Sequence, residues 1–128
     1  MYTVSDTHAL LWYLTNDKKL SNRARKFFDK VDTGELTLVI SAIVLLECLD
    51  IFEKKKVVYD FQGLLLRIMH SRNIVLAAVD WHLVLEIERT EGFRDLHDRA
   101  IIAAARLFDA VLISRDAIIK RLYAKTVW

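Results

Sequence analysis

The stretch from Leu36 to Phe52, LTLVISAIVLLECLDIF, changes character halfway along its length. Residues 36–40 predict a short buried strand, and Ser41 predicts the N-cap of a long apolar helix that reaches about Phe52. A strand that leads directly into a covering helix is the building unit of proteins with a parallel sheet. This stretch therefore favours an α/β fold.

The same alternation continues on both sides of this stretch. Further strands are predicted at residues 2–5, 74–77 and 111–114, with an edge strand at 126–128. Helices are predicted at 7–14, after the N-cap Ser21, and at 60–71, 80–90, 98–108 and 116–123, with chain breaks at Gly34 and Gly92. We therefore predict an α/β fold, a three-layer α/β/α sandwich with a mainly parallel central sheet. No linker or repeat divides the chain, so we expect a single domain over residues 1–128.

The composition excludes several classes of protein. Of the 128 residues, 54% are hydrophobic and 28% are charged, and the net charge of +2 permits nucleic-acid binding without indicating it. The single cysteine excludes an internal disulfide and a zinc site built from several cysteines. With three glycines, the chain has no glycine-rich phosphate loop. Its apolar runs are too short to span a bilayer and no signal peptide is evident, so we expect a cytoplasmic protein with no membrane partner.

Two aspartates follow predicted strands that are far apart in the sequence. Asp6 comes directly after the first strand, and Asp116 follows the strand at 111–114. In a parallel sheet, ligands bind beyond the carboxyl ends of the strands, where the strand order reverses. The two carboxylates are therefore candidates for one site. The alternative for each is that it caps the helix that follows.

Glu47 and Asp98 are the other two candidate site residues. Glu47 lies inside the apolar helix after Ser41, where a carboxylate loses hydration unless it is paired or bound to a metal ion. Its alternative is a position at the helix surface. Asp98 opens an alanine-rich helix, and its alternative is a favourable interaction with the helix dipole. Asp95 is close enough in sequence to compete with Asp98 for the same role.

Four acids at one point repel each other strongly unless cations neutralise them. Ligands that are all oxygen atoms favour Mg²⁺ or Mn²⁺ over zinc. A metal ion held in this way activates water and neutralises charge on a phosphodiester. If the four acids converge, the pattern indicates hydrolytic phosphoryl chemistry without a protein nucleophile.

Four segments together resemble the motifs of PIN domains in the VapC toxin group. They are Val4 to Trp12 (VSDTHALLW), Ile40 to Glu47 (ISAIVLLE), Leu96 to Ala105 (LHDRAIIAAA) and Leu112 to Asp116 (LISRD). Their order, spacing and coverage of nearly the whole chain carry the resemblance. It implies that Asp6, Glu47, Asp98 and Asp116 form a metal-binding catalytic cluster, with Ser114 hydrogen-bonded within it and Asp95 as an additional acid.

The resemblance also implies a function. PIN domains of this group are mostly ribonucleases, and many are toxins inhibited by a cognate antitoxin, so we expect a Mg²⁺- or Mn²⁺-dependent endoribonuclease, the toxin of a type II toxin–antitoxin pair. Its substrate is then RNA, cleaved to leave a 5′-phosphate, and its partners are an antitoxin and a second copy of the chain in a homodimer. Arg99 and Arg115 are candidate phosphate contacts, or else they balance charge within the cluster.

Other notable residues receive structural interpretations. We expect His8 to serve at a helix start, His97 to be exposed rather than a base, and Lys54-Lys55-Lys56 to be a solvated helix end. Four aromatic residues are expected mostly in the core: Trp12, Tyr13, Phe52 and Trp81.

Three other functions compete with the nuclease. A phosphatase with an aspartate nucleophile requires Asp-x-Asp after the first strand, but His8 occupies the third position. A receiver module requires paired acids after the first strand and a central acceptor aspartate, and both are missing. The remaining alternative is a non-catalytic PIN-fold protein that binds RNA or acts as a scaffold.

Overall fold

A parallel sheet forms the centre of the computed structural model, which describes residues 1–54, 57–91 and 95–128. Within these residues five strands, all parallel to their neighbours, lie in the order β3-β2-β1-β4-β5. The strands are β1 (Tyr2–Ser5), β2 (Thr37–Ser41), β3 (Ile74–Ala77), β4 (Val111–Ile113) and β5 (Thr126–Val127). Because β1 lies between β2 and β4, the strand order reverses at the β1–β4 pair.

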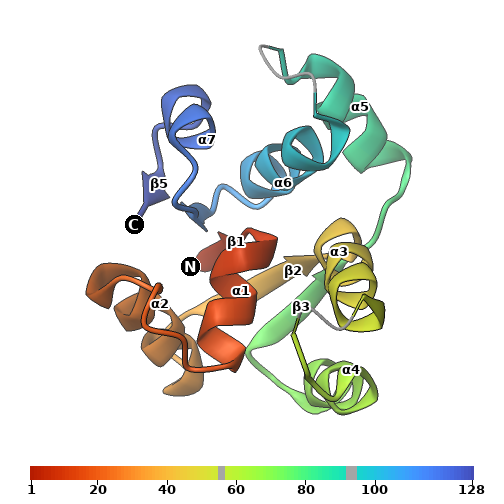
Figure 1. The fold of residues 1–128 in the computed structure, drawn as a ribbon. Helices are drawn as coiled ribbons and strands as arrows, with labels where there is room; N and C mark the ends of the chain where they lie inside the picture. The colour runs from red at the N-terminus through yellow and green to blue at the C-terminus, as the bar shows by residue number, and fades with distance from the viewer. Residues whose placement is uncertain (55–56, 92–94) are drawn as a thin grey trace.

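Helices connect the strands along the chain. They are α1 (Thr7–Leu14), α2 (Asn22–Asp32), α3 (Ala42–Glu53), α4 (Phe61–His70), α5 (Trp81–Arg89), α6 (Leu96–Leu107) and α7 (Ala117–Leu122). Figure 1 shows α6 and α7 on one side of the sheet and α1, α2 and α4 on the other, with α3 at the end of β2. The predicted three-layer α/β/α sandwich with a parallel central sheet is confirmed. No helix in the described part of the chain is long and apolar enough to cross a membrane.

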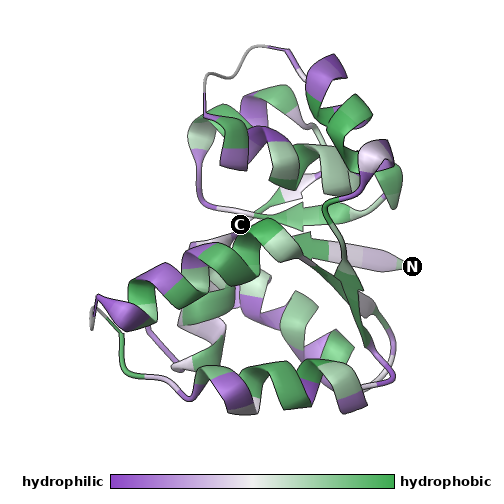
Figure 2. Ribbon diagram, turned by 90° about the vertical axis from the view of Figure 1, so that its right-hand side faces the viewer, coloured by the Kyte–Doolittle hydropathy of each residue, from purple (hydrophilic) through white to green (hydrophobic). Residues whose placement is uncertain are grey.

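The core is made by the sheet and the inner faces of the helices. Val4, Val39, Leu112 and Ile113 on three central strands are fully buried, as is Phe28 of α2. Figure 2 shows most of the sheet as hydrophobic, although the strand that begins at the N-terminus starts pale purple, and it shows hydrophilic and hydrophobic segments alternating along the helices. Burial on both faces explains why β2, TLVIS, reads as a nearly continuous apolar run in the sequence.

Helix α5 packs on α6 rather than directly on the sheet, as Figure 1 shows. A second, smaller apolar cluster joins Leu83 and Ile87 of α5 to the alanines of α6 at 100, 103 and 104. The guanidinium of Arg99 donates to the carbonyl oxygens of Thr90 and Ile87 at 3.1 and 2.8 Å, near the end of α5. Small alanine side chains let α5 approach closely, and Arg99 adds hydrogen bonds to carbonyl groups at the end of that helix.

Two expectations from the sequence are wrong. Helix α6 begins at Leu96, not at Asp98, because the side chain of Asp95 caps it by accepting from the amide of Asp98 at 3.0 Å. Trp81 is 66% exposed, because it is the first residue of α5 and that helix buries Leu83 and Ile87 instead.

The other expected core aromatics and the loop residues have simpler outcomes. Trp12, Tyr13 and Phe52 are partly buried against the main core, as predicted. Lys54 ends α3 and forms an exposed ion pair with Asp50 at 2.8 Å. Lys55, Lys56 and the predicted break at Gly92 lie outside the described residues.

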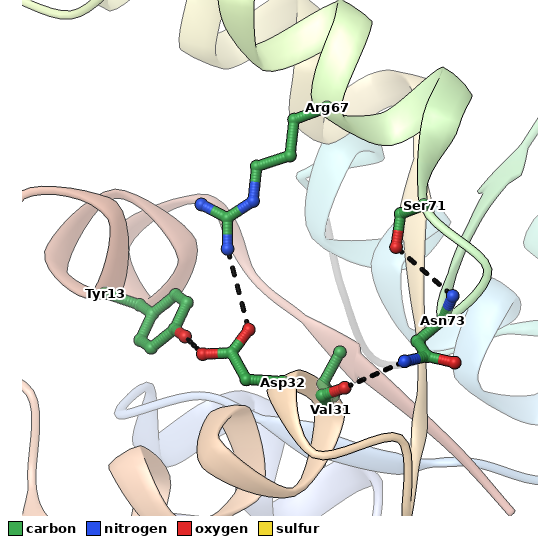
Figure 3. A network of polar contacts seen from close by, with 6 residues as sticks. All are labelled: Tyr13, Val31, Asp32, Arg67, Ser71 and Asn73. Atoms are coloured by element: carbon green, nitrogen blue, oxygen red, sulfur yellow. Dashed lines mark hydrogen bonds and ion pairs between the residues drawn. The ribbon is translucent and has the colours of Figure 1, made fainter.

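A polar network joins α1, α2 and α4 on the side of the sheet away from α6. Figure 3 shows the hydroxyl of Tyr13 donating to the carboxylate of Asp32, which also pairs with Arg67 at 3.5 Å. Burial, and then the bond to Asp32, raise the pKa of Tyr13 to about 12, so its hydroxyl keeps the proton that it donates. In this network every charged group has a partner.

Candidate active site

Asp6 and Asp116 lie next to each other in space because their strands pair. The register joins Ser5 to Ile113, and the amide of Asp6 donates to the carbonyl of Ile113 at 3.1 Å. Asp6 follows β1 and Asp116 follows β4 by three residues, at the point where the strand order reverses. Parallel α/β sheets commonly bind ligands at this position.

Both aspartates also cap the helices that follow them. Asp6 Oδ1 accepts from the amide of Ala9 at 2.8 Å. Asp116 Oδ1 accepts from the amides of Ile118 and Ile119 at 2.8 and 3.0 Å. The capping interpretation is therefore right, but it does not compete with a role in a site, because each capping bond uses one carboxylate oxygen and leaves the other for a ligand.

Glu47 reaches the same region from α3. Its Oε1 atom is buried and has no hydrogen-bond partner among the described residues, and the same is true of the neighbouring Thr7 Oγ1. The exposed imidazole of His97 lies nearby, with Nδ1 at 3.6 Å from Glu47 Oε1. A buried carboxylate oxygen without a donor is costly, so this oxygen marks a place for a ligand.

A single cavity of about 520 Å³ contains all four predicted acids. Asp6, Glu47, Asp98 and Asp116 come from four elements that are up to 110 residues apart, the separation of Asp6 and Asp116 (116 − 6). The other residues that line the cavity are Thr7, His8, Trp12, Lys19, Ile101, Arg115 and Ile119. The fold therefore brings together the acids that the sequence pattern linked.

Three of the four acids in this cavity hold their protons more tightly than free carboxylates do. Burial, followed by repulsion from the carboxylates of Asp95, Asp116, Glu47 and Asp6, raises the pKa of Asp98 to about 6. Burial also raises the pKa of Asp6 and of Glu47. Burial is thus the main cause of all three shifts, and neighbouring carboxylates add to each of them.

Comparison with known proteins places this architecture in a family. The model of the PIN domain matches residues 3–125. The chain belongs to the PIN domain family. The resemblance seen in the four sequence motifs is thereby confirmed.

Solved structures with this PIN fold include several toxins, at low sequence identity. One chain of a toxin–antitoxin complex from Klebsiella pneumoniae has a TM-score of 0.67 and 15% identity, with 98% of this chain and 96% of that chain covered. VapBC2 from Rickettsia felis, bound to a promoter DNA fragment, has a TM-score of 0.65 and 15% identity, with 95% of this chain and 93% of that chain covered. VapC20 from Mycobacterium tuberculosis, described as a toxin that cleaves the sarcin–ricin loop, has a TM-score of 0.67 and 13% identity. The match covers 93% of each chain. No curated protein matches the chain by sequence.

The remaining predicted site residues of this PIN domain lie in different places. Ser114 is buried, accepts from the amide of Asp116 at 3.1 Å, and by hydrogen bonding partly offsets the rise in the pKa of Asp6 that burial causes. Asp95 caps α6 and does not line the cavity, although its charge raises the pKa of Asp98. Arg115 lines the cavity. Arg99 does not, because its guanidinium is bound to the end of α5.

Six lining residues are not among the predicted site residues: Thr7, His8, Trp12, Lys19, Ile101 and Ile119. The first three belong to the first motif, but the sequence assigns His8 only to a helix start and Trp12 to the core. Lys19 lies in the loop after α1, and no pattern in the sequence distinguishes it from the adjacent Lys18. Its place in the cavity depends on how the loop folds back over Trp12.

The four acids provide the kind of ligand atoms that a hard divalent cation prefers. These atoms are carboxylate oxygens, one of which is buried without a hydrogen-bond partner, and a cation would neutralise the repulsion between them. As they stand, no three histidine, cysteine, aspartate or glutamate side chains among residues 1–54, 57–91 and 95–128 are arranged around a common point for a metal ion.

Proposed function

We propose that this PIN domain is a metal-dependent endoribonuclease and the toxin of a type II toxin–antitoxin pair. The observation that carries the proposal is the cavity at the β1–β4 reversal, lined by Asp6, Glu47, Asp98 and Asp116. Clustered carboxylates of this kind serve enzymes that hydrolyse phosphodiesters, and the fold of the chain is shared with a toxin described as cleaving the sarcin–ricin loop.

In the proposed mechanism each acid has a defined task. Asp6, Asp98 and Asp116 would hold Mg²⁺ or Mn²⁺, and the bound ion would supply an activated water and neutralise charge on the phosphate. Glu47, whose Oε1 lacks a donor, accepts a proton or a hydrogen bond from water in the cavity. Ser114 Oγ keeps Asp116 in place through the hydrogen bond that it accepts from the Asp116 amide at 3.1 Å. The products are an RNA with a 5′-phosphate and one with a 3′-hydroxyl.

The toxin role requires a protein partner. Two of the compared structures are described as a toxin–antitoxin complex and as VapBC2, which supports a cognate antitoxin as the partner here. The chain also exposes large apolar side chains on α4 and α5, namely Leu66, Met69, Trp81, Val84 and Leu85, which is the kind of surface that proteins bury against one another. The homodimer stays a prediction from the family resemblance.

The test of the nuclease compares the full-length chain with its Asp98→Asn variant on a mixture of structured RNAs. Each protein is incubated with Mg²⁺, with Mn²⁺ and with a chelator, and circular dichroism checks the fold. We expect metal-dependent cleavage by the unchanged chain, and at least about a hundredfold loss in Asp98→Asn, because one carboxylate of the cluster is removed without a change in shape.

Asp29→Asn is the matched control, because it removes an exposed aspartate on α2, outside the cavity. It should cleave like the unchanged chain. Equal cleavage by Asp98→Asn and the unchanged chain would exclude the proposed site. RNA binding without cleavage under any condition would favour the alternative, a non-catalytic RNA-binding or scaffold protein.

A further inference from the structure

Two cations are held against one aromatic ring at the edge of the acidic cavity. The guanidinium carbon of Arg115 lies 4.8 Å from the centre of the Trp12 ring, and Lys19 Nζ lies 5.9 Å from it. All three side chains line the same cavity as the four acids. They come from α1, from the loop that follows it and from the β4–α7 connection, so the arrangement exists only in the folded chain.

Trp12 is itself fixed by its neighbours. Its ring is partly buried against the main core and packs edge-to-face on Trp128, with ring centres 5.7 Å apart. A cation over an aromatic face is attracted by the negative charge of that face. The ring therefore restricts two long side chains that are otherwise exposed and free to move.

Neither cation is neutralised by the protein. Among the described residues, Lys19 and Arg115 form no ion pair, although Asp116 follows Arg115 directly in the chain. Arg99 differs, because its guanidinium donates to two carbonyl oxygens of the α5 end. Two positive charges thus remain available for an external anion in a cavity that four acids also line.

We infer that Trp12 holds Lys19 and Arg115 in position to bind a backbone phosphate of RNA next to the phosphate that is cleaved. This inference rests on the proposed nuclease function, and it adds a second contact between the protein and the RNA backbone. Acids repel an RNA backbone, and a pair of fixed cations beside them offsets that repulsion without reading the base sequence. Trp12 acts here as a positioning residue, through the two cations.

The test measures RNA binding by chains that do not cleave. A fluorescently labelled single-stranded RNA of mixed sequence is titrated with the Asp98→Asn chain and with the same chain carrying Lys19→Ala or Arg115→Ala, at several salt concentrations. We expect each added substitution to weaken binding about fivefold at low salt. We also expect it to reduce the slope of log affinity against log salt by about 0.7, the value for one phosphate contact to a single strand.

Lys30→Ala in the same background is the matched control. Lys30 also lies over an aromatic ring, with Nζ 6.0 Å from the centre of Phe27, but it is on α2 and does not line the cavity. It removes the same charge and should leave both the affinity and the salt slope almost unchanged. If Lys30→Ala and Lys19→Ala weaken RNA binding equally, the loss of affinity comes from the change in net charge alone, and the inference is overturned.

Trp12 is tested by two substitutions. Trp12→Leu removes the ring, and Trp12→Phe keeps a smaller ring that attracts cations less strongly. We expect RNA affinity to fall in the order Trp, Phe, Leu, while a thermal melt reports how much each change costs the fold. If Phe and Leu are equally weak at equal stability, the ring does not position the cations.

Failure of this inference is distinct from failure of the nuclease proposal. In the chain with all four acids intact, Lys19→Ala and Arg115→Ala should raise KM more than they lower kcat, because the contact is made in the ground state and the transition state alike. Cleavage that is intact with unchanged RNA affinity and KM in both variants overturns the phosphate contact and leaves the nuclease standing. If the chain without substitutions does not cleave RNA at all, this result contradicts the proposed nuclease function, while the binding titrations still test the phosphate contact.

Discussion

Asp32 and Asp98 are both partly exposed aspartates on helices, yet their surroundings are opposite. Asp32 accepts from the Tyr13 hydroxyl and pairs with Arg67 at 3.5 Å. Asp98 faces the carboxylates of Asp95, Asp116, Glu47 and Asp6, which together with burial raise its pKa to about 6. The fold thus places a hydrogen-bond donor and a cation next to Asp32, whereas it places other carboxylates next to Asp98.

The contrast distinguishes a carboxylate that serves the fold from one that serves a site. A paired acid stabilises the native state and requires nothing from outside. A cluster of unpaired acids costs stability, and a protein gains from it only when a ligand completes it. The four predictions that follow test this difference from its largest expected effect to its smallest.

The largest effect is expected on catalysis at Glu47. Glu47→Gln keeps the size of the side chain but removes the charge at the buried Oε1, so we expect RNA cleavage to fall about a hundredfold or more. A cleavage time course under single-turnover conditions measures it. Glu53→Gln, at the exposed end of the same helix, should have no effect, and equal losses in both would assign the effect to α3 as a whole.

The next effect is stabilisation by the cation. Adding Mg²⁺ or Mn²⁺ at about a hundred times its Kd should raise the free energy of unfolding by about 2.7 kcal/mol, because only the folded chain gathers the acids. Thermal melts with and without a chelator measure the change. Asp98→Asn should show a much smaller shift, whereas equal shifts in both chains would mean that the ion binds elsewhere.

A smaller effect is expected in the paired region. Asp32→Asn removes the charge that Arg67 pairs with, and we expect a loss of about 1 kcal/mol of stability, limited by the 49% exposure of the Asp32 side chain. Urea unfolding measures it, and RNA cleavage should be unchanged when the variant is assayed well below its melting temperature. A large loss of cleavage in the folded variant would break the distinction between the two regions.

The smallest effect concerns the chain without cations. The folded pKa of Asp98, about 6, lies above the ordinary value of 3.8, so the folded chain binds the proton more tightly than the unfolded chain. The free energy of unfolding should therefore rise as the pH falls from about 7 to about 4.

Asp98→Asn removes a buried charge and the repulsion from its neighbours, and should stabilise the metal-free chain at neutral pH by about 0.5 kcal/mol, less than the shift alone implies because water screens a partly exposed group. The gain should disappear as the pH falls below about 4. Unfolding in urea with a chelator at several pH values measures it. A variant that is less stable than the unchanged chain at neutral pH would show that the acids do not repel one another.

The fold was predictable because its elements follow local rules. Ser21, Ser41 and Asp60 each cap the helix that they precede, and β2 is apolar at its three central residues, 38–40, which are buried. The predicted start of α6 is two residues too late, because Asp95 and Asp98 are both good residues for a helix start and only the geometry selects Asp95 as the cap. Trp81 was expected in the core from its size, but its position at a helix start decides its exposure.

The site was predictable in part. The acids stood out because each occupies a strand end or an apolar helix, and the family pattern connected them. The orientation of a long side chain does not follow from its position in the sequence. Arg99 and Arg115 both stand next to a predicted acid, yet one binds the end of α5 and the other lies over Trp12. Lys19 is brought to the cavity by a loop, which no periodic pattern describes.

The attachment of α5 to α6 has a consequence for local unfolding. Because α5 is held by a small apolar cluster of its own and by the bonds of Arg99, it can detach while the sheet and the main core stay intact. Such an opening costs less free energy than unfolding the whole domain. The amide hydrogens of α5 should therefore exchange with deuterium sooner than those of β1 and β2, which are released only when the sheet itself comes apart.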